Sequence, residues 1–210
     1  MKKLLCLILA LLLAGCGAAA EEPPELKDSL TVHYLAGGAL VRCNGENLLV
    51  DCGGEITAEK LKNYGVEKLS RVVLTGAGRD AGLEELLKTF PAEVHKPGEK
   101  ETTFWLDCAA VTVGETGAVH VAFGEDGFLF RGAAAETTAQ ENVRVLWIAE
   151  GISPGENVKP DYLLVDGRAE EGLKETYEVF DRDYGPVTVE TEGKGVRISF
   201  TLFNSDSVAS

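Results

Sequence analysis

The stretch from Arg71 to Phe90, RVVLTGAGRDAGLEELLKTF, has the outline of a catalytic junction from which the reactive side chains are missing. A short apolar run leads to Thr75, a Gly-x-Gly turn follows, and Asp80 stands where a helix is expected to begin. Such a strand-to-loop-to-helix junction could present metal ligands, but here it presents mainly glycine and alanine. The first question is therefore what other chemistry the chain could perform.

Groups for nucleophilic or metal chemistry are few and scattered. His33, His95 and His120 are isolated in the sequence, with no spacing that is typical of a zinc site. Ser153 precedes a Pro-Gly pair and has no histidine at motif spacing, and Cys52 has no evident base as partner. The sequence therefore predicts no nucleophilic catalytic centre.

Composition and charge limit the possible partners. The chain has 210 residues, 45% of them hydrophobic, which is enough for one domain with a sizeable core. Its formal charge is -14, and it becomes -16 when Lys2 and Lys3 are removed with the expected leader. A surface this acidic repels phosphate backbones, so we expect no nucleic-acid partner.

The N-terminal residues have the pattern of an export signal. Two lysines precede an apolar run from Leu4 to Ala14, which is too short to span a bilayer of about 30 Å. The tetrad Leu13-Ala14-Gly15-Cys16 resembles a bacterial lipobox. This resemblance implies cleavage before Cys16 and its lipidation, for example with palmitate, so that the chain is anchored by acyl groups to the extracytoplasmic face of the bacterial cell membrane. A plain signal peptide is the alternative.

The expected organisation follows from this pattern. We expect a lipoprotein signal peptide over 1–15, a flexible tether rich in Ala, Glu and Pro over 16–28, one domain over 29–203, and a polar tail over 204–210.

Three cysteines remain in the mature chain outside the lipid anchor. They are Cys43, Cys52 and Cys108, an odd set that permits one disulfide at most. An exported protein could oxidise a pair, but the sequence does not choose among the three pairings, and buried free thiols are slightly favoured. None of them has Cys-x-x-Cys spacing.

The body of the chain alternates short strands with a few short helices. Asn44-Gly45 supplies the positive φ angles of a tight hairpin turn, Thr57 is the expected N-cap of a helix through Tyr64, and Asp80 the expected N-cap of Ala81 to Phe90. Strands are expected from Leu30 and Ala39, then over 47–51, 72–75, 92–95, 109–113, 118–123, 127–131, 143–148 and 161–165, with a helical turn over 170–175 and closing strands over 177–200.

This order of elements resembles the metallo-β-lactamase-like domain of the ComEC-type competence proteins and related hydrolases. The resemblance extends from Leu30 to about Phe200 and rests on LLVDCGG, VVLTGAGRDAGLEELL, VRVLWIAEG and PDYLLVDG. It implies an α+β fold, a four-layer αββα sandwich of the metallo-β-lactamase type.

The resemblance also implies where metal ligands would lie. The family motif Thr/Ser-His-x-His-x-Asp-His begins at Thr75, its histidines fall on Gly76, Gly78 and Ala81, and its aspartate falls on Asp80. The family's later Gly-Asp falls on Ala149-Glu150, and its His-His-Gly falls near Gly167-Arg168-Ala169. Every matched histidine is absent, so we expect a degenerate site and neither zinc nor another cofactor.

What remains is a set of carboxylates. If the resemblance holds, Asp51, Asp80 and Glu150 lie on one rim of the sandwich, where they could attract a hard cation weakly. The structural explanations are a turn residue for Asp51, a helix cap for Asp80 and a solvated loop charge for Glu150, and these are favoured. We expect a binding or scaffolding module with an unknown protein or small-molecule partner. The alternative is a metallo-hydrolase of this class with a non-standard metal site.

Overall fold

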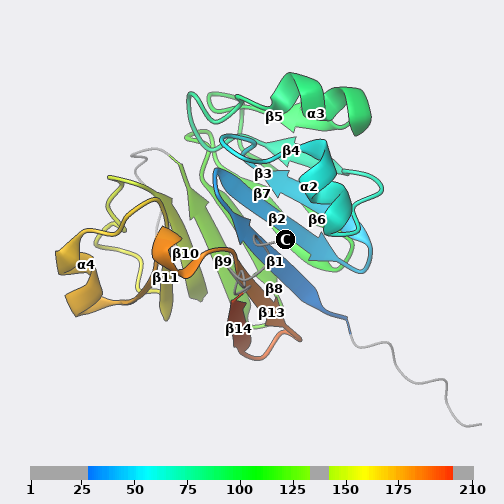
Figure 1. Cartoon of the computed structure of the whole chain (residues 1–210). Coiled ribbons are helices and arrows are strands. Elements are labelled where there is room, and N and C mark those ends of the chain that lie inside the picture. Colours follow the sequence, from blue (N-terminus) through cyan, green and yellow to red (C-terminus); the bar gives the residue numbers. More distant parts are fainter. Residues whose placement is uncertain (1–27, 133–141, 201–210) are drawn as a thin grey trace, which may run out of the picture.

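Two seven-stranded mixed β-sheets form the centre of the molecule (Figure 1). The computed structural model describes residues 28–132 and 142–200. The expected signal peptide, most of the tether, Cys16 and the polar tail lie outside the described residues, as do 133–141. Within the described parts, no helix is long and apolar enough to cross a membrane.

The first sheet has the strand order β14-β13-β1-β2-β3-β4-β5, and its strands β3, β4 and β5 run parallel. Its strands are β1 (Leu30–Leu35), β2 (Gly38–Cys43), β3 (Glu46–Val50), β4 (Arg71–Val73), β5 (Glu93–His95), β13 (Val187–Thr191) and β14 (Val196–Phe200).

The second sheet has the order β12-β11-β10-β9-β8-β7-β6, and its strands β9 to β12 run parallel. Its strands are β6 (Thr102–Leu106), β7 (Ala109–Val113), β8 (Val119–Phe123), β9 (Asp126–Arg131), β10 (Val143–Ala149), β11 (Tyr162–Asp166) and β12 (Glu178–Phe180).

The helices lie on the outer faces of the sheets. Helices α2 (Ala58–Asn63) and α3 (Leu83–Thr89) cover the first sheet, where Leu61 and Leu86 join an apolar cluster with Leu40 and Leu49. Helix α4 (Glu171–Thr176) lies on the other side of the molecule, beside β11 (Figure 1). Its Leu173 packs against the outer cluster of the second sheet. A single 3₁₀ turn, η1 (Arg182–Tyr184), precedes β13.

The main core lies between the sheets. Alternate side chains of β1, β2, β7, β8, β9 and β10 point into it, and Phe128, Phe130 and Trp147 are its largest fully buried members. The strands β9 and β10 are buried along almost their whole length because both of their faces are covered. The predicted pair of β-sheets with few helices is thus confirmed.

Local predictions met different outcomes. Asn44 and Gly45 both adopt positive φ, of 46° and 89°, as the hairpin turn requires. Thr57 is confirmed as an N-cap, because its Oγ1 accepts a hydrogen bond from the Lys60 amide at 3.1 Å.

The predicted capping role of Asp80 is wrong. Helix α3 begins only at Leu83, its N-cap is Gly82, and no side chain caps it. Asp80 contributes its backbone carbonyl, which accepts the Leu83 amide at 3.0 Å. The sequence analysis also missed the edge strand β6, because an edge strand exposes one side and shows only a weak apolar pattern.

The inter-sheet core predicts a large effect for one truncation. Replacing Phe128, which is fully buried, by alanine should lower the free energy of unfolding by about 3–5 kcal/mol, since the cavity cannot collapse between two sheets. Urea denaturation followed by circular dichroism measures this loss. Trp105→Ala is the matched control: its side chain is 68% exposed, and its removal should change stability by less than about 0.5 kcal/mol. Equal losses in the two variants would contradict this assignment of the core.

Candidate functional site

The parallel strands of both sheets end at the same end of the sandwich, which we call the rim. Strands β3 and β4 lead into Asp51 and Thr75, and β9 and β11 lead into Gly132 and Asp166. The carboxyl ends of parallel strands are where open sheets usually bind ligands. The rim is therefore the first place to look for chemistry.

Asp51 is the most buried acidic side chain of the rim. It follows β3 with a positive φ of 60°, and its residue surface is 0% exposed. Its Oδ1 accepts the Thr75 amide and its Oδ2 accepts the Thr75 hydroxyl, both at 2.7 Å. Burial raises the pKa of this carboxyl to about 6, although the two bonds from Thr75 and the charge of Arg79 act in the opposite direction.

Arg79 connects the carboxylates of the two sheets. Its Nη1 donates to Asp166 Oδ2 at 2.6 Å, and its Nε lies 3.8 Å from Asp51 Oδ2. The guanidinium carbon also lies 5.3 Å from the ring centre of Trp147, within the range of a cation–π contact. The other oxygen of Asp166 accepts the Gly37 amide at 3.0 Å. A fixed positive charge thus stands between two acids at the rim.

The rim is also closely packed. A side-chain carbon at Gly132 would overlap the Thr75 hydroxyl and lie 3.3 Å from Asp51 Oδ2. At Gly167 such a carbon would lie 2.5 Å from the carboxylate of Glu150. Both glycines allow the loops after β9 and β11 to approach their neighbours closely, as glycine alone can.

The structure brings some of the sequence-predicted residues together and separates others. Asp51 and Glu150 belong to segments that end at the same rim, but the Glu150 side chain lies over Gly167 and is exposed. Asp80 is exposed and close enough to Cys52 to act on its thiol electrostatically. No hydrogen bond or ion pair between described residues joins the three carboxylates.

The glycines and the alanine at the family's histidine positions have no side-chain atom that could bind a metal ion. Gly76 is buried, Gly78 is exposed with a φ of 74°, and Ala81 is exposed. Sequence reasoning missed Arg79 and Asp166 as rim residues. The Asp-Gly pair that follows the buried strand β11 was the available signal for Asp166.

The donor set of the rim does not fit a zinc ion of the family type. Such a site needs several neutral imidazoles around an open position, whereas the rim offers carboxylates and a guanidinium. The three histidines lie elsewhere: His33 hydrogen-bonds Thr188, His95 pairs with Glu99, and His120 lies beside Gly127. Burial and the charge of Arg42 lower the pKa of His33 to about 4, so it is neutral at pH 7.

A cavity of ≈ 400 Å³ opens beside the rim, a size that suits a small ligand. Among its lining residues are Trp147, Asp166 and Arg182. Tyr34 also lines it, and its buried hydroxyl has no hydrogen-bond partner among the described residues. The cavity therefore combines an apolar wall with both charges and an unused polar group.

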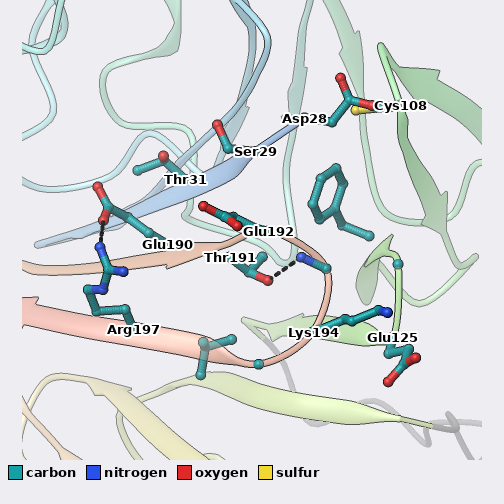
Figure 2. A pocket seen from close by; sticks show the side chains of 15 residues that line it. Asp28, Ser29, Thr31, Cys108, Glu125, Glu190, Thr191, Glu192, Lys194 and Arg197 are labelled. Atoms are coloured by element: carbon teal, nitrogen blue, oxygen red, sulfur yellow. Dashed lines mark hydrogen bonds and ion pairs between the residues drawn. The ribbon is translucent and has the colours of Figure 1, made fainter. Parts of the chain in front are cut away.

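The opposite end of the sandwich, which we call the distal end, holds a different set of donors. Cys43 and Cys108 place their sulfurs 3.0 Å apart, and ligand atoms of Cys43, Asp107 and Cys108 all lie within 4.8 Å of one another. A groove of ≈ 1190 Å³ lies at this end (Figure 2). Asp28, Glu125, Glu190 and Glu192 line it, together with Lys194 and Arg197.

Comparison with known proteins gives solved structures but no sequence relative. No family model matches the chain. No curated protein matches it either. Among the solved structures, the metallo-β-lactamase fold protein YhfI from Bacillus subtilis has a TM-score of 0.46 and 12% identity, covering 82% of this chain and 100% of that one.

Two further solved structures are metal-dependent proteins. A putative zinc-dependent hydrolase of the metallo-β-lactamase superfamily from Thermotoga maritima has a TM-score of 0.43 and 7% identity, covering 68% of this chain and 78% of that one. CmlA, a diiron β-hydroxylase from Streptomyces venezuelae, has a TM-score of 0.45 and 16% identity, covering 69% of this chain and 45% of that one. At this level of similarity the likeness concerns the fold, and no activity is carried over.

The expectation that the chain carries no metal-binding cofactor site needs correction. The finding that overturns it is the group of Cys43, Asp107 and Cys108, whose ligand atoms lie close enough together to hold a metal ion. The sequence analysis missed this group because Cys43 and Cys108 are 65 positions apart and only the packing of the two sheets brings them together.

The buried carboxyl of Asp51 predicts a pH dependence of stability. Its pKa rises from 3.8 to about 6 on folding, so the folded state binds more protons than the unfolded state between these values. The contribution of Asp51 to stability should therefore be largest below pH 4 and fall as the pH rises to 6, at about 1.4 kcal/mol for each unit of pKa shift. Asp51→Asn should remove this fall, since an amide can still accept the Thr75 N–H.

Urea denaturation of both proteins between pH 4 and 8 measures this dependence. Glu93→Gln is the control, because Glu93 forms an exposed ion pair with Arg71 and its removal should leave the pH profile unchanged. Parallel pH profiles of wild type and Asp51→Asn would show that Asp51 keeps an ordinary pKa.

Proposed function

We propose that this chain is a lipoprotein anchored to the extracytoplasmic face of a bacterial cell membrane. In this proposal its domain is a divergent member of the metallo-β-lactamase fold, related to the ComEC-type proteins, that binds or scaffolds at the envelope and does not hydrolyse. The contact of Arg79 with Asp51 and Asp166 is the observation that carries the non-hydrolytic role, and the Leu13-Ala14-Gly15-Cys16 tetrad supports the anchor.

The charge balance at the rim supports a binding role. A hydrolase of this fold needs an activated water, and a metal ion lowers the pKa of that water toward 7. Here the positive charge at the rim is a guanidinium, which has no open coordination position and stays protonated. The nearest thiol is no substitute, because burial and the charges of Asp51 and Asp80 raise the pKa of Cys52 to about 12. The rim can hold charges in place, but it generates no nucleophile.

The size and lining of the adjoining cavity favour a small polar molecule as the ligand. Its ≈ 400 Å³ would take a molecule of a few rings, and Lys60 and Arg182 line it together with Glu55 and Asp166. Charges of both signs favour a zwitterionic or mixed polar molecule over a purely apolar one. The acidic character of the whole chain argues against nucleic acid.

The first test concerns the absence of hydrolysis. The purified full chain should hydrolyse β-lactam, thioester and phosphodiester substrates less than about tenfold faster than the blank, with or without added divalent metal, whereas enzymes accelerate such reactions by at least about 10⁶-fold. Product formation over hours measures this rate. An activity that survives purification and disappears in Asp51→Asn, but not in Glu93→Gln, would show that the rim is catalytic and would overturn the binding role.

The second test concerns the anchor. Cys16→Ser should release the protein from the membrane fraction and abolish labelling by a fatty-acid analogue, because the thiol is the expected site of acylation. Fractionation and acyl labelling in the bacterium measure both effects, and Cys6→Ser serves as the matched control, since Cys6 lies inside the expected signal peptide. Labelling that persists in Cys16→Ser would refute the lipoprotein assignment without affecting the assignment of the rim.

A further inference from the structure

Two thiols from different sheets meet at the distal end. Cys43 is the last residue of β2 and is completely buried, whereas Cys108 lies in the turn between β6 and β7 and is partly buried. Their sulfurs are 3.0 Å apart. A disulfide bond of about 2.0 Å requires the two sulfurs to approach each other by about 1 Å more, which a change of side-chain rotamer can provide.

The surrounding structure holds this pair in place. Cys43 belongs to the inter-sheet core, and Cys108 packs against it. Asp107 adopts a positive φ of 52° in the tight β6–β7 turn that carries Cys108. The Asn44 amide donates to Asp107 Oδ2 at 2.6 Å and to Cys108 Sγ at 3.5 Å. The two hairpin turns are therefore tied together around the sulfurs.

The distance between the sulfurs distinguishes a disulfide from a shared metal ion. Two thiolates on one tetrahedral zinc ion, with bonds of about 2.3 Å, would lie about 3.8 Å apart. The observed 3.0 Å is shorter than this separation. The third donor of the group, Asp107, is exposed and already accepts a hydrogen bond from Asn44.

The negative charges around Cys108 also favour a disulfide over a metal site. Burial, the neighbouring Cys43 and the carboxylates of Asp28 and Asp107 raise the pKa of the Cys108 thiol to about 12. A metal-bound thiolate would have to keep its negative charge beside these carboxylates, whereas disulfide formation needs the thiolate only transiently. A disulfide carries no charge, so it is compatible with both the burial and the acidic neighbours.

We propose that Cys43 and Cys108 form a disulfide that joins the two sheets at the distal end. The pairing itself rests on the geometry. Only its formation in the cell rests on the proposed export, since disulfides persist in oxidising compartments. Cys52 is the remaining thiol of the described residues, and it stays reduced in this proposal.

Formation of the bond requires a disulfide-containing oxidant, such as oxidised glutathione or a thiol oxidoreductase. Cys108, the more exposed thiol, loses its proton and attacks one sulfur of the oxidant, which expels one thiolate and leaves a mixed disulfide. Cys43 then attacks the Cys108 sulfur and expels the second thiolate. The protons of the two cysteines pass to the two released thiolates, so the oxidant is reduced by two electrons and the protein is oxidised by two.

The bond would join parts of the chain that are 65 positions apart and would strengthen one wall of the groove. Asp28 and Cys108 lie next to each other at one end of the groove in Figure 2. Asn44 also donates to Asp28 Oδ1 at 2.9 Å, so the first described residue of the domain is attached to the same cluster. The disulfide would therefore stabilise the place where the domain meets the preceding chain.

Thiol mapping tests the proposal on the full chain, extracted in detergent and, in a second sample, equilibrated with oxidised glutathione. Free thiols are alkylated in denaturant, and the peptides are then analysed by mass spectrometry with and without reductant. We expect a cross-linked peptide pair containing Cys43 and Cys108, two hydrogens lighter than the reduced peptides, and alkylation of Cys52. Reduction should lower Tm by roughly 5–15 °C.

Two variants and a metal measurement complete the test. Cys108→Ser should lose the cross-link and show no further fall in Tm on reduction, whereas Cys52→Ala should keep both the cross-link and the reductant-dependent shift. Alkylation of Cys43 and Cys108 in the glutathione-treated wild type would overturn the proposal, and so would a cross-link to Cys52. Zinc bound at one equivalent and released together with both free thiols would overturn it in favour of a metal site. If the cross-link forms with glutathione but not in the cell, the pairing stands and the proposed export fails.

Discussion

The rim depends on how the buried charge of Asp51 is compensated. A carboxylate with no exposed surface is costly unless its oxygens find donors and a counter-charge. Thr75, just after β4, provides two donors, and Arg79 provides the charge from the same loop. Because Arg79 also binds Asp166, the same guanidinium holds the first sheet to the second at this end. Removal of this one side chain would leave two acids facing each other across the sandwich.

The glycine-rich loop after β4 supplies the arginine of this arrangement. Here Gly78 takes a positive φ, and the next residue, Arg79, reaches back to the carboxylates. The loop thus places a positive charge between two acids at the rim. The strand-to-loop-to-helix junction therefore has a structural role although it presents no histidine. The adjoining cavity has charged side chains in its lining.

Prediction from sequence was successful where the determinants are local. The hairpin at Asn44-Gly45 and the cap at Thr57 follow from backbone preferences and from one side-chain hydrogen bond, so a few residues suffice to predict them. The prediction that Asp80 caps a helix failed because helix α3 begins two residues later than propensity indicates. A tertiary hydrogen bond from the Gly82 amide to the Cys52 carbonyl decides that start.

The residue pairs that form the candidate sites could not be predicted from local sequence patterns. Arg79 and Asp166 are 87 positions apart, and Cys43 and Cys108 are 65 apart. Neither pair has a spacing motif, because pairing across two sheets leaves no periodic trace in one sequence. The resemblance placed Asp51 and Glu150 at one end of the fold, but it could not show that an arginine stands between Asp51 and another acid. Such contacts become visible only when both sheets are in place.

The direction of β1 has a consequence for how the domain is presented to its surroundings. This strand begins at Leu30, next to Cys43 at the distal end, and finishes at Leu35, beside the loop whose Gly37 binds Asp166. Six residues of extended chain cover about 20 Å, so the start of β1 and the rim lie at opposite ends of the domain. In a domain tethered through its N-terminus, the cavity would face away from the tether. A force on the tether would act on the paired strands β1, β2 and β13 before it reached Arg79.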